Sequence, residues 1–257
     1  MKCNRRSLAV AVLVSVLGAG ACSAPRESEP PRLRVEVIGS SPHDPRAFTQ
    51  GLEVVDGVLY ESTGMWGVSS ARATDLATGT ETARVGLPGR LFGEGMTRAG
   101  SIVWQLTWQD GFAIARDPST LAELRRVEYA GEGWGLCAQP ERLVMSDGTG
   151  TLTFRDRVSF EQIGSVTLSG YRDPQPNELD CAPDGTVYAN NYPSDEILHI
   201  DPQSGEILAV IDAAGLLTPA ERAGTDVLNG IAGLGGDRFL VTGKYWPRMF
   251  EVRFVGN

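Results

Sequence analysis

The chain has 257 residues, of which 42% are hydrophobic, enough to form the core of one large all-β domain. Its formal net charge of −9 argues against a nucleic-acid partner, because phosphate binding needs a basic face. Otherwise a charge of this size indicates mainly that the protein stays soluble.

Residues 1–21 have the composition of an export signal peptide. A basic start is followed by an apolar run that ends in small residues and is too short for a convincing membrane span. The run stops at Cys22 in "LGAGACSAP", which resembles a bacterial lipoprotein processing site and predicts lipidation of Cys22. Ordinary cleavage to a secreted product is the alternative. Residues 22–32 are polar and proline-rich and predict a flexible tether, so we expect an exported protein of the cell envelope or periplasm.

From residue 33 onward, short β-rich runs separated by Gly, Asp and Pro predict strands and tight turns, with almost no helix. Five runs resemble one another, since each has a polar or aromatic start, two or three apolar residues, a turn and a second apolar strand. They are "QGLEVVDGVLYEST" from Gln50, "EGMTRAGSIVWQLT" from Glu94, "WGLCAQPERLVMSD" from Trp134, "ELDCAPDGTVYANN" from Glu178 and "NGIAGLGGDRFLVT" from Asn229. A period of about 40 to 50 residues predicts a five-bladed β-propeller over residues 33–257. A β-sandwich, the competing fold, would not explain the repeats.

The two ends of this region complement each other. The last repeat runs out of chain soon after "MFEVRFV", whereas "RLRVEVIGSSP" near the N-terminus is a spare strand. We expect the spare strand to complete the last blade, which would close the ring and leave no open sheet edge. In the longest interval between repeats, "TPAERAG" predicts one short helix within a loop.

Beyond Cys22 the chain has two cysteines, Cys137 and Cys181, at equivalent positions of the third and fourth repeats. These positions would place them on inner strands of neighbouring blades. A disulfide needs α-carbons within about 7 Å, which is attainable near the propeller axis. In an oxidising compartment the pair is therefore a disulfide candidate, and two small buried thiols are the alternative.

In a propeller, the residues that begin the inner strands surround one mouth of the central channel. Here they are Phe48, Gln50, Phe92, Glu94, Trp134, Asn177, Glu178 and Asn229. Trp108, Tyr192 and Lys244 follow second strands or lie in connecting loops, from which some can fold over the same mouth. One carboxylate, one lysine, several amides and an aromatic cluster predict a small pocket with a polar floor and aromatic walls.

Eight short motifs, distributed over all five repeats, also match one known family. They are "FTQGL", "ESTG", "FGEGMT", "LTW", "GWGL", "NELD", "LNGIA" and "TGKYWP". With these motifs the chain resembles the plant-type glutaminyl-peptide cyclotransferases from about Phe48 to Phe254. This family is unrelated to the zinc-dependent animal-type enzymes.

The resemblance implies a five-bladed propeller that converts the N-terminal glutamine of peptides to pyroglutamate and releases ammonia, with chemistry that rests on a glutamate. Family roles carry over to Phe48, Gln50, Phe92, Glu94, Trp108, Trp134, Asn177 and Lys244, with Tyr192 in place of an aromatic that is usually tryptophan. We expect Glu94 and Lys244 to be catalytic and the others to bind substrate. One carboxylate can take the amine proton and deliver it to the departing nitrogen.

Other residues have a structural interpretation. Trp104 and Trp246 are expected in the core, Glu61 and Glu132 as hydrogen-bonding or loop groups, and His43 and His199 at the surface. Two separated histidines do not make a zinc site, which normally keeps three protein ligands. Glu178 is the one other carboxylate that deserves a test. We expect no cofactor, although a structural calcium ion in the channel is conceivable, and we expect a monomer.

Two other functions stay open. The first is a metal-dependent propeller hydrolase or lactonase that uses Glu94, Asn177, Glu178 and Asn229, although Lys244 would repel a divalent cation there. Metal analysis with an EDTA activity assay would separate it from a cyclotransferase. The second is a non-catalytic binding propeller, for which Glu94→Gln would leave function unchanged.

Overall fold

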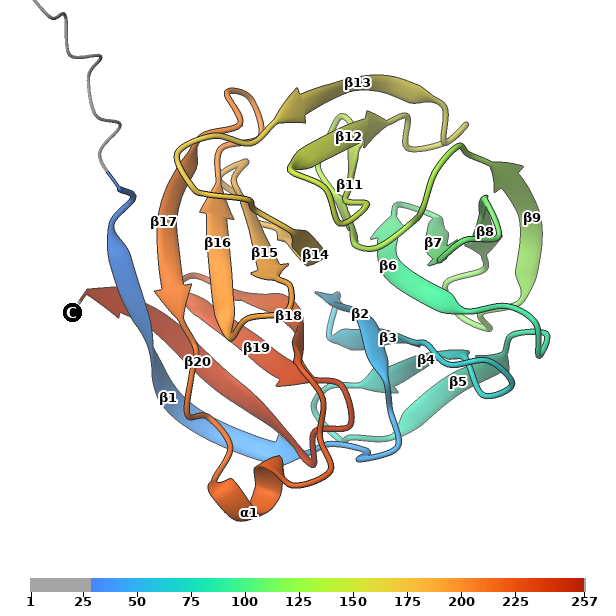
Figure 1. Ribbon diagram of the computed structural model, residues 1–257. Helices are drawn as coiled ribbons and strands as arrows, with labels where there is room; N and C mark the ends of the chain where they lie inside the picture. Colours follow the sequence, from blue (N-terminus) through green and yellow to red (C-terminus); the bar gives the residue numbers. More distant parts are fainter. Residues whose placement is uncertain (1–28, 257) are drawn as a thin grey trace, which may run out of the picture.

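The computed structural model describes residues 29–256 of the chain, and these residues form an all-β structure (Figure 1). The predicted signal peptide, Cys22 and most of the predicted tether lie outside the described residues. Strand β1 (Arg32–Pro42) begins one residue before the predicted start of the domain. Within residues 29–256, no helix is long and apolar enough to cross a membrane.

Twelve of the strands form three four-stranded antiparallel sheets, each from one continuous segment. The first sheet consists of β2 (Thr49–Val55), β3 (Val58–Thr63), β4 (Ser70–Asp75) and β5 (Glu81–Gly86). The second consists of β6 (Gly93–Ala99), β7 (Ile102–Thr107), β8 (Phe112–Arg116) and β9 (Glu123–Glu128). The third consists of β10 (Leu136–Ala138), β11 (Leu143–Met145), β12 (Thr151–Arg155) and β13 (Gln162–Thr167).

The remaining strands form one eight-stranded sheet in the order β14-β15-β16-β17-β1-β20-β19-β18. Besides β1, these are β14 (Pro176–Cys181), β15 (Val187–Asn191), β16 (Glu196–Ile200), β17 (Ile207–Asp212), β18 (Leu228–Gly235), β19 (Arg238–Gly243) and β20 (Arg248–Gly256). The spare strand β1 pairs with β20 from Leu33 to Pro42, but with β17 only from Arg32 to Arg34. The sheet therefore contains two four-stranded groups, β14–β17 and β18–β20 with β1.

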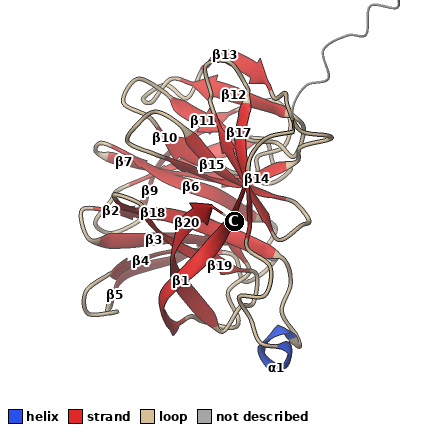
Figure 2. Cartoon of the chain, turned by 90° about the vertical axis from the view of Figure 1, so that its left-hand side faces the viewer, coloured by secondary structure: helices blue, strands red, loops and turns tan. Residues whose placement is uncertain are grey.

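The one helix among residues 29–256, α1 (Pro219–Arg222), lies within the predicted "TPAERAG" segment, as expected. Thr218 begins it with a capping box, in which the Thr218 hydroxyl accepts a hydrogen bond from the Glu221 backbone and the Glu221 carboxylate accepts one from the Thr218 backbone. Figure 2 shows α1 in a loop that projects from the edge of the strands, away from the centre.

The four-stranded groups surround a common centre, with β2, β6, β14 and β18 innermost (Figure 1). In turn, β2 contacts β6 and β18, β10 contacts β6 and β14, and β14 contacts β18. Apolar clusters fill the spaces between neighbouring groups, such as the cluster of Tyr60 and Ala71 with Met96 and Val103. A disulfide joins Cys137 of β10 to Cys181 of β14, with α-carbons 5.4 Å apart. The hydrophobic core therefore lies between the sheets, and the innermost strands surround the centre, where the predicted site residues lie.

The expectation that His43 lies at the surface is wrong. His43 is buried, and its Nε2 lies 3.0 Å from the Oε1 of Glu61. The buried Glu61 carboxylate also accepts hydrogen bonds from Thr49 Oγ1 at 2.8 Å and Arg72 Nε at 2.7 Å. A buried charge needs such partners, and the imidazole supplies one of them. His199 is half-buried and also differs from the surface expectation.

Candidate active site

The innermost strands are irregular at the residues predicted to form the site. The pairing register shifts around Gln50 in β2 and around Glu94 in β6. Similar shifts occur around Asn177 in β14 and Asn229 in β18. A β-bulge bends its strand and changes the direction of a side chain. The same irregularity therefore occurs in the innermost strand of four of the five four-stranded groups, each time at a polar side chain near the centre.

Glycines beside these residues allow the innermost strands to touch. A Cβ atom at Gly51 would lie 2.5 Å from the backbone nitrogen of Met96, and one at Gly95 would lie 2.6 Å from that of Leu136. No larger residue fits such close backbone contacts. The glycines around Glu94 in "FGEGMT" thus let β6 approach its neighbours while Glu94 lies at the centre.

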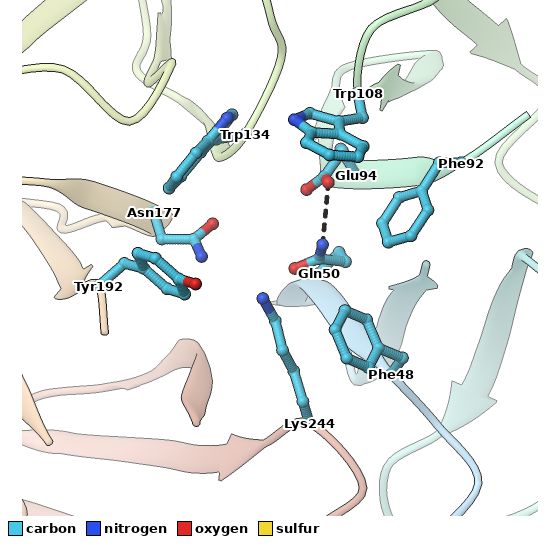
Figure 3. Close-up of a pocket in the computed structure, with 9 residues that line it drawn as sticks. All are labelled: Phe48, Gln50, Phe92, Glu94, Trp108, Trp134, Asn177, Tyr192 and Lys244. Carbon is cyan, nitrogen blue, oxygen red and sulfur yellow. Dashed lines mark hydrogen bonds between the residues drawn. The ribbon is translucent and has the colours of Figure 1, made fainter. Parts of the chain in front are cut away.

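All nine residues predicted to bind substrate or act in catalysis line one pocket of about 160 Å³ (Figure 3): Phe48, Gln50, Phe92, Glu94, Trp108, Trp134, Asn177, Tyr192 and Lys244. They lie on, or directly beside, strands of all five four-stranded groups. The structure therefore brings together residues that are far apart in sequence, while their roles in binding and catalysis stay predictions.

Glu94 is the acidic group of the pocket, and its residue is only 4% exposed. Gln50 Nε2 donates a hydrogen bond of 2.8 Å to Glu94 Oε1. Asn229 Nδ2 in turn donates to Gln50 Oε1 at 3.0 Å and so fixes the orientation of the Gln50 amide. Burial raises the pKa of Glu94 well above its usual range, the charge of Lys244 opposes this rise and the charge of Glu132 adds to it.

Lys244 is the basic group of the pocket and is 5% exposed. Its Nζ lies 4.7 Å from the ring centre of Phe48 and 5.6 Å from that of Tyr192. Burial lowers the pKa of Lys244, and the charges of Glu94 and Asp226 oppose this decrease. Figure 3 shows the ammonium group pointing into the space between the pocket walls. Oppositely charged buried groups with shifted pKa values are typical of functional sites.

Aromatic rings form the walls of the pocket. The rings of Phe92 and Trp108 lie 5.6 Å apart, and those of Trp134 and Tyr192 lie 5.5 Å apart on another wall. Trp66, which the sequence did not single out, lies 5.2 Å from the ring of Phe92 and is 59% exposed. The pocket therefore has apolar walls, with an exposed indole beside one of them.

Glu178 is not part of the pocket lining. It is fully buried, and its two carboxylate oxygens accept hydrogen bonds from the backbone of Leu52 at 3.1 Å and of Ile231 at 2.7 Å. Its position as the polar start of a repeat thus serves strand packing. Within residues 29–256, no group of three or more His, Cys, Asp or Glu side chains is arranged to hold a metal ion.

Trp66 is the residue near the site that the sequence did not single out. Glu132 is a hydrogen-bonding loop residue, as predicted, but its contact with both Trp108 and Trp134 was not expected. Asn229 lies beside Gln50, at the mouth where its repeat position placed it. Asn229 holds the same repeat position as Gln50 and Glu94, and this position is the signal that placed it near the site. Glu132 lies two residues before Trp134, where proximity in sequence was the only indication. No pattern marked Trp66, which lies in a loop between strands.

Comparison with known proteins identifies the family. A model of the family described as glutamine cyclotransferase matches residues 8–254. The glutaminyl-peptide cyclotransferase of Arabidopsis thaliana is 36% identical over 230 residues, which are 85% of this chain and 71% of that protein. The crystal structure of glutaminyl cyclase from Myxococcus xanthus is 38% identical and superposes with a TM-score of 0.77, covering 88% of this chain and 99% of that one. The resemblance inferred from the eight motifs is confirmed, and the chain belongs to the glutamine cyclotransferase family.

Proposed function

We propose that this chain is a glutaminyl-peptide cyclotransferase, which converts the N-terminal glutamine of a peptide to pyroglutamate and releases ammonia. Its family and both relatives support this activity. The observation that carries the proposal is that a buried carboxylate, Glu94, and a buried ammonium, Lys244, line the same aromatic-walled pocket.

The size of the pocket fits the substrate. At about 160 Å³, it is smaller than the pockets of roughly 300 to 1,000 Å³ that hold drug-sized molecules, and it therefore suits one residue of a peptide. The aromatic walls hold the flat γ-amide in a folded pose close to the α-amine. Such orientation is what makes an intramolecular attack fast.

Glu94 would act as both base and acid. Gln50 occupies Glu94 Oε1, which leaves Oε2 to take a proton from the α-amino group of the substrate. The amine nitrogen then attacks the γ-amide carbon, and a five-membered ring closes. Glu94 returns the proton to the amide nitrogen, the bond between carbon and that nitrogen breaks, and ammonia leaves. A carboxylate whose pKa is raised by burial suits both steps near neutral pH.

Two further polar groups would hold the reacting atoms. The Lys244 ammonium can donate hydrogen bonds to the oxyanion of the tetrahedral intermediate, and a well-aimed donor of this kind contributes about 3 to 4 kcal/mol. Asn177 Oδ1 is buried without a hydrogen-bond partner. An amino or amide hydrogen of the substrate would satisfy this acceptor, since a buried polar atom without a partner is costly. All the proposed steps use side chains alone.

The finer architecture belongs to the same proposal. We infer that the five four-stranded groups are the blades of one closed five-bladed propeller, with β1 completing the last blade. The contacts between successive innermost strands and the pairing of β1 with β20 support this arrangement. We also propose export and lipidation at Cys22, which rest on the sequence of the N-terminal segment.

Ammonia release from a dipeptide that begins with glutamine tests the activity, and the Glu94→Gln variant tests the mechanism. Removal of a general acid–base group typically costs about 10² to 10⁴ in rate, so we expect kcat to fall by at least about 100-fold. Glu141→Gln, which changes an exposed carboxylate, is the matched control. A parent chain that releases no ammonia would refute the function. A fully active Glu94→Gln variant would refute only the role of Glu94 and not the function.

A further inference from the structure

Glu132 lies between β9 and β10 and does not line the pocket, yet it contacts two of the pocket walls. Its Oε2 accepts a hydrogen bond of 2.7 Å from Trp108 Nε1 and one of 3.0 Å from Trp134 Nε1. Its Oε1 accepts a third hydrogen bond, of 2.7 Å, from Gln109 Nε2. One half-buried carboxylate therefore holds both indoles.

The two indoles belong to different sheets. Trp108 directly follows β7 of the second sheet, and Trp134 precedes β10 of the third sheet. The indole N–H is a donor only, and each of the two donates to the same oxygen atom. Because hydrogen bonds to an ionised acceptor are shorter and stronger than neutral ones, the carboxylate can fix the spacing between these walls.

Glu132 also acts on the pocket through its charge. Hydrogen bonds from Trp134, Gln109 and Trp108 hold the pKa of Glu132 below its usual range, so this carboxylate stays ionised at neutral pH. Its negative charge is one of the causes that raise the pKa of Glu94. Loss of the charge at position 132 should therefore lower the pKa of Glu94.

We propose that Glu132 is a positioning residue for cyclisation, which sets the distance between the Trp108 and Trp134 walls that grip the N-terminal glutamine. The inference rests on the proposed function and adds to it a group outside the pocket. Glu132 touches no reacting atom, so its effect on binding passes through the two indoles.

Two substitutions separate this role from a structural one. Glu132→Ala removes the acceptor from both indoles, and we expect KM for a glutamine-leading dipeptide to rise about 10-fold while kcat changes less. That rise corresponds to about 1.4 kcal/mol, less than the two charged hydrogen bonds can supply. Glu132→Gln keeps an acceptor oxygen but loses the charge. It should restore KM to within about threefold of the parent, a factor below 1 kcal/mol. It should also move the acid limb of the kcat/KM profile to lower pH.

The control is Glu128→Gln, an exposed carboxylate on the neighbouring strand β9 that contacts neither indole, and thermal unfolding of each variant checks that it is folded. An unchanged KM in Glu132→Ala would overturn the inference. So would equal losses in both variants, or a Glu132→Gln profile with an unmoved acid limb. A parent chain without ammonia release would overturn the proposed function and this inference together, whereas an active parent with these outcomes overturns the inference alone.

Discussion

Glu94 and Lys244 lie in one buried pocket, and the charge of each favours the ionised form of the other. Burial acts in the opposite direction on both groups, because it disfavours either charge. The two groups therefore depend on each other for the ionised states that the proposed mechanism requires, in which Glu94 would accept a proton and Lys244 would stabilise an oxyanion. Replacing one should move the titration of the other.

The Lys244→Met variant tests this dependence. Since the positive charge lowers the pKa of Glu94, its removal should raise that pKa, and the acid limb of the kcat/KM profile should move to higher pH. This direction is opposite to that expected for Glu132→Gln. Loss of an oxyanion donor should also lower kcat by about 10² to 10³.

Arg172→Met, at a side chain that is 95% exposed, is the control for loss of one surface charge. Both variants and the parent chain should be assayed over the same pH range. A Lys244→Met profile whose acid limb stays in place would show that Glu94 titrates independently of the lysine.

At this scale, the sequence could predict the residues that share motif and repeat positions. Gln50, Glu94 and Lys244 were recognisable in this way, and the structure places them in one pocket. Glu132 could not be recognised as a partner of both indoles, because that contact depends on how two sheets pack. The burial of His43 likewise could not be predicted, because it depends on a contact with Glu61, which lies on β3 and is not close to His43 in the sequence.

At the scale of the strand, backbone contacts between innermost strands decide where the polar groups lie. Gly95 donates its N–H to the carbonyl of Trp134 at 2.7 Å. The backbone atoms around its α-carbon leave no space for a side chain. Glu94 precedes this contact directly. A change in the packing of β6 against the loop before β10 should therefore disturb both stability and activity.

The Gly95→Ala variant measures this constraint. The added methyl group would meet backbone atoms that cannot move independently, and such overpacking typically costs about 1 to 3 kcal/mol. We expect urea unfolding to show a loss in this range and kcat to fall because Glu94 shifts. Gly86→Ala, at the end of β5, adds a methyl group where nothing lies within 4 Å. If Gly95→Ala lost no more free energy of unfolding than Gly86→Ala, β6 would be able to accommodate the methyl group without destabilising the fold.

The repeats predicted the strand pairs and the pairing of β1 with β20, because both depend on a period that the sequence displays. The register shifts around Gln50 and Glu94 were not predictable in the same way. The position of a bulge depends on contacts with the neighbouring strand and with the neighbouring sheet. The local sequence shows neither kind of contact. Glycine on both sides of Glu94 was the one visible trace of this constraint.

At the scale of the whole molecule, buried carboxylates link strands that belong to different groups. Glu178 of β14 accepts hydrogen bonds from the backbone of β2 and of β18. Asp180 of β14 accepts one of 3.0 Å from Gly233 of β18. Burial raises the pKa of Asp180 to about 6, against the effect of this hydrogen bond. The stability of the fold should therefore depend on pH through these groups.

Asp180→Asn tests this dependence, because asparagine keeps the acceptor and cannot ionise. In the unfolded chain an aspartate ionises near pH 4, whereas folded Asp180 keeps its proton up to about pH 6. Between these values the unfolded chain releases the proton first, so the contribution of Asp180 to stability is lost as pH rises. The advantage of Asp180→Asn over the parent should grow from pH 4 to 7, by at most about 3 kcal/mol. Urea unfolding at several pH values measures it, and a constant difference would contradict the prediction.

The pocket draws on residues from Phe48 to Lys244, and the first described strand of the chain pairs with the last. Nearly the whole polypeptide must consequently be synthesised before the pocket has all of its lining residues. Fragments that end before the final hairpin lack the ammonium group and leave β1 without its antiparallel neighbour. Synthesis of this hairpin would thus be the step after which the proposed chemistry can begin.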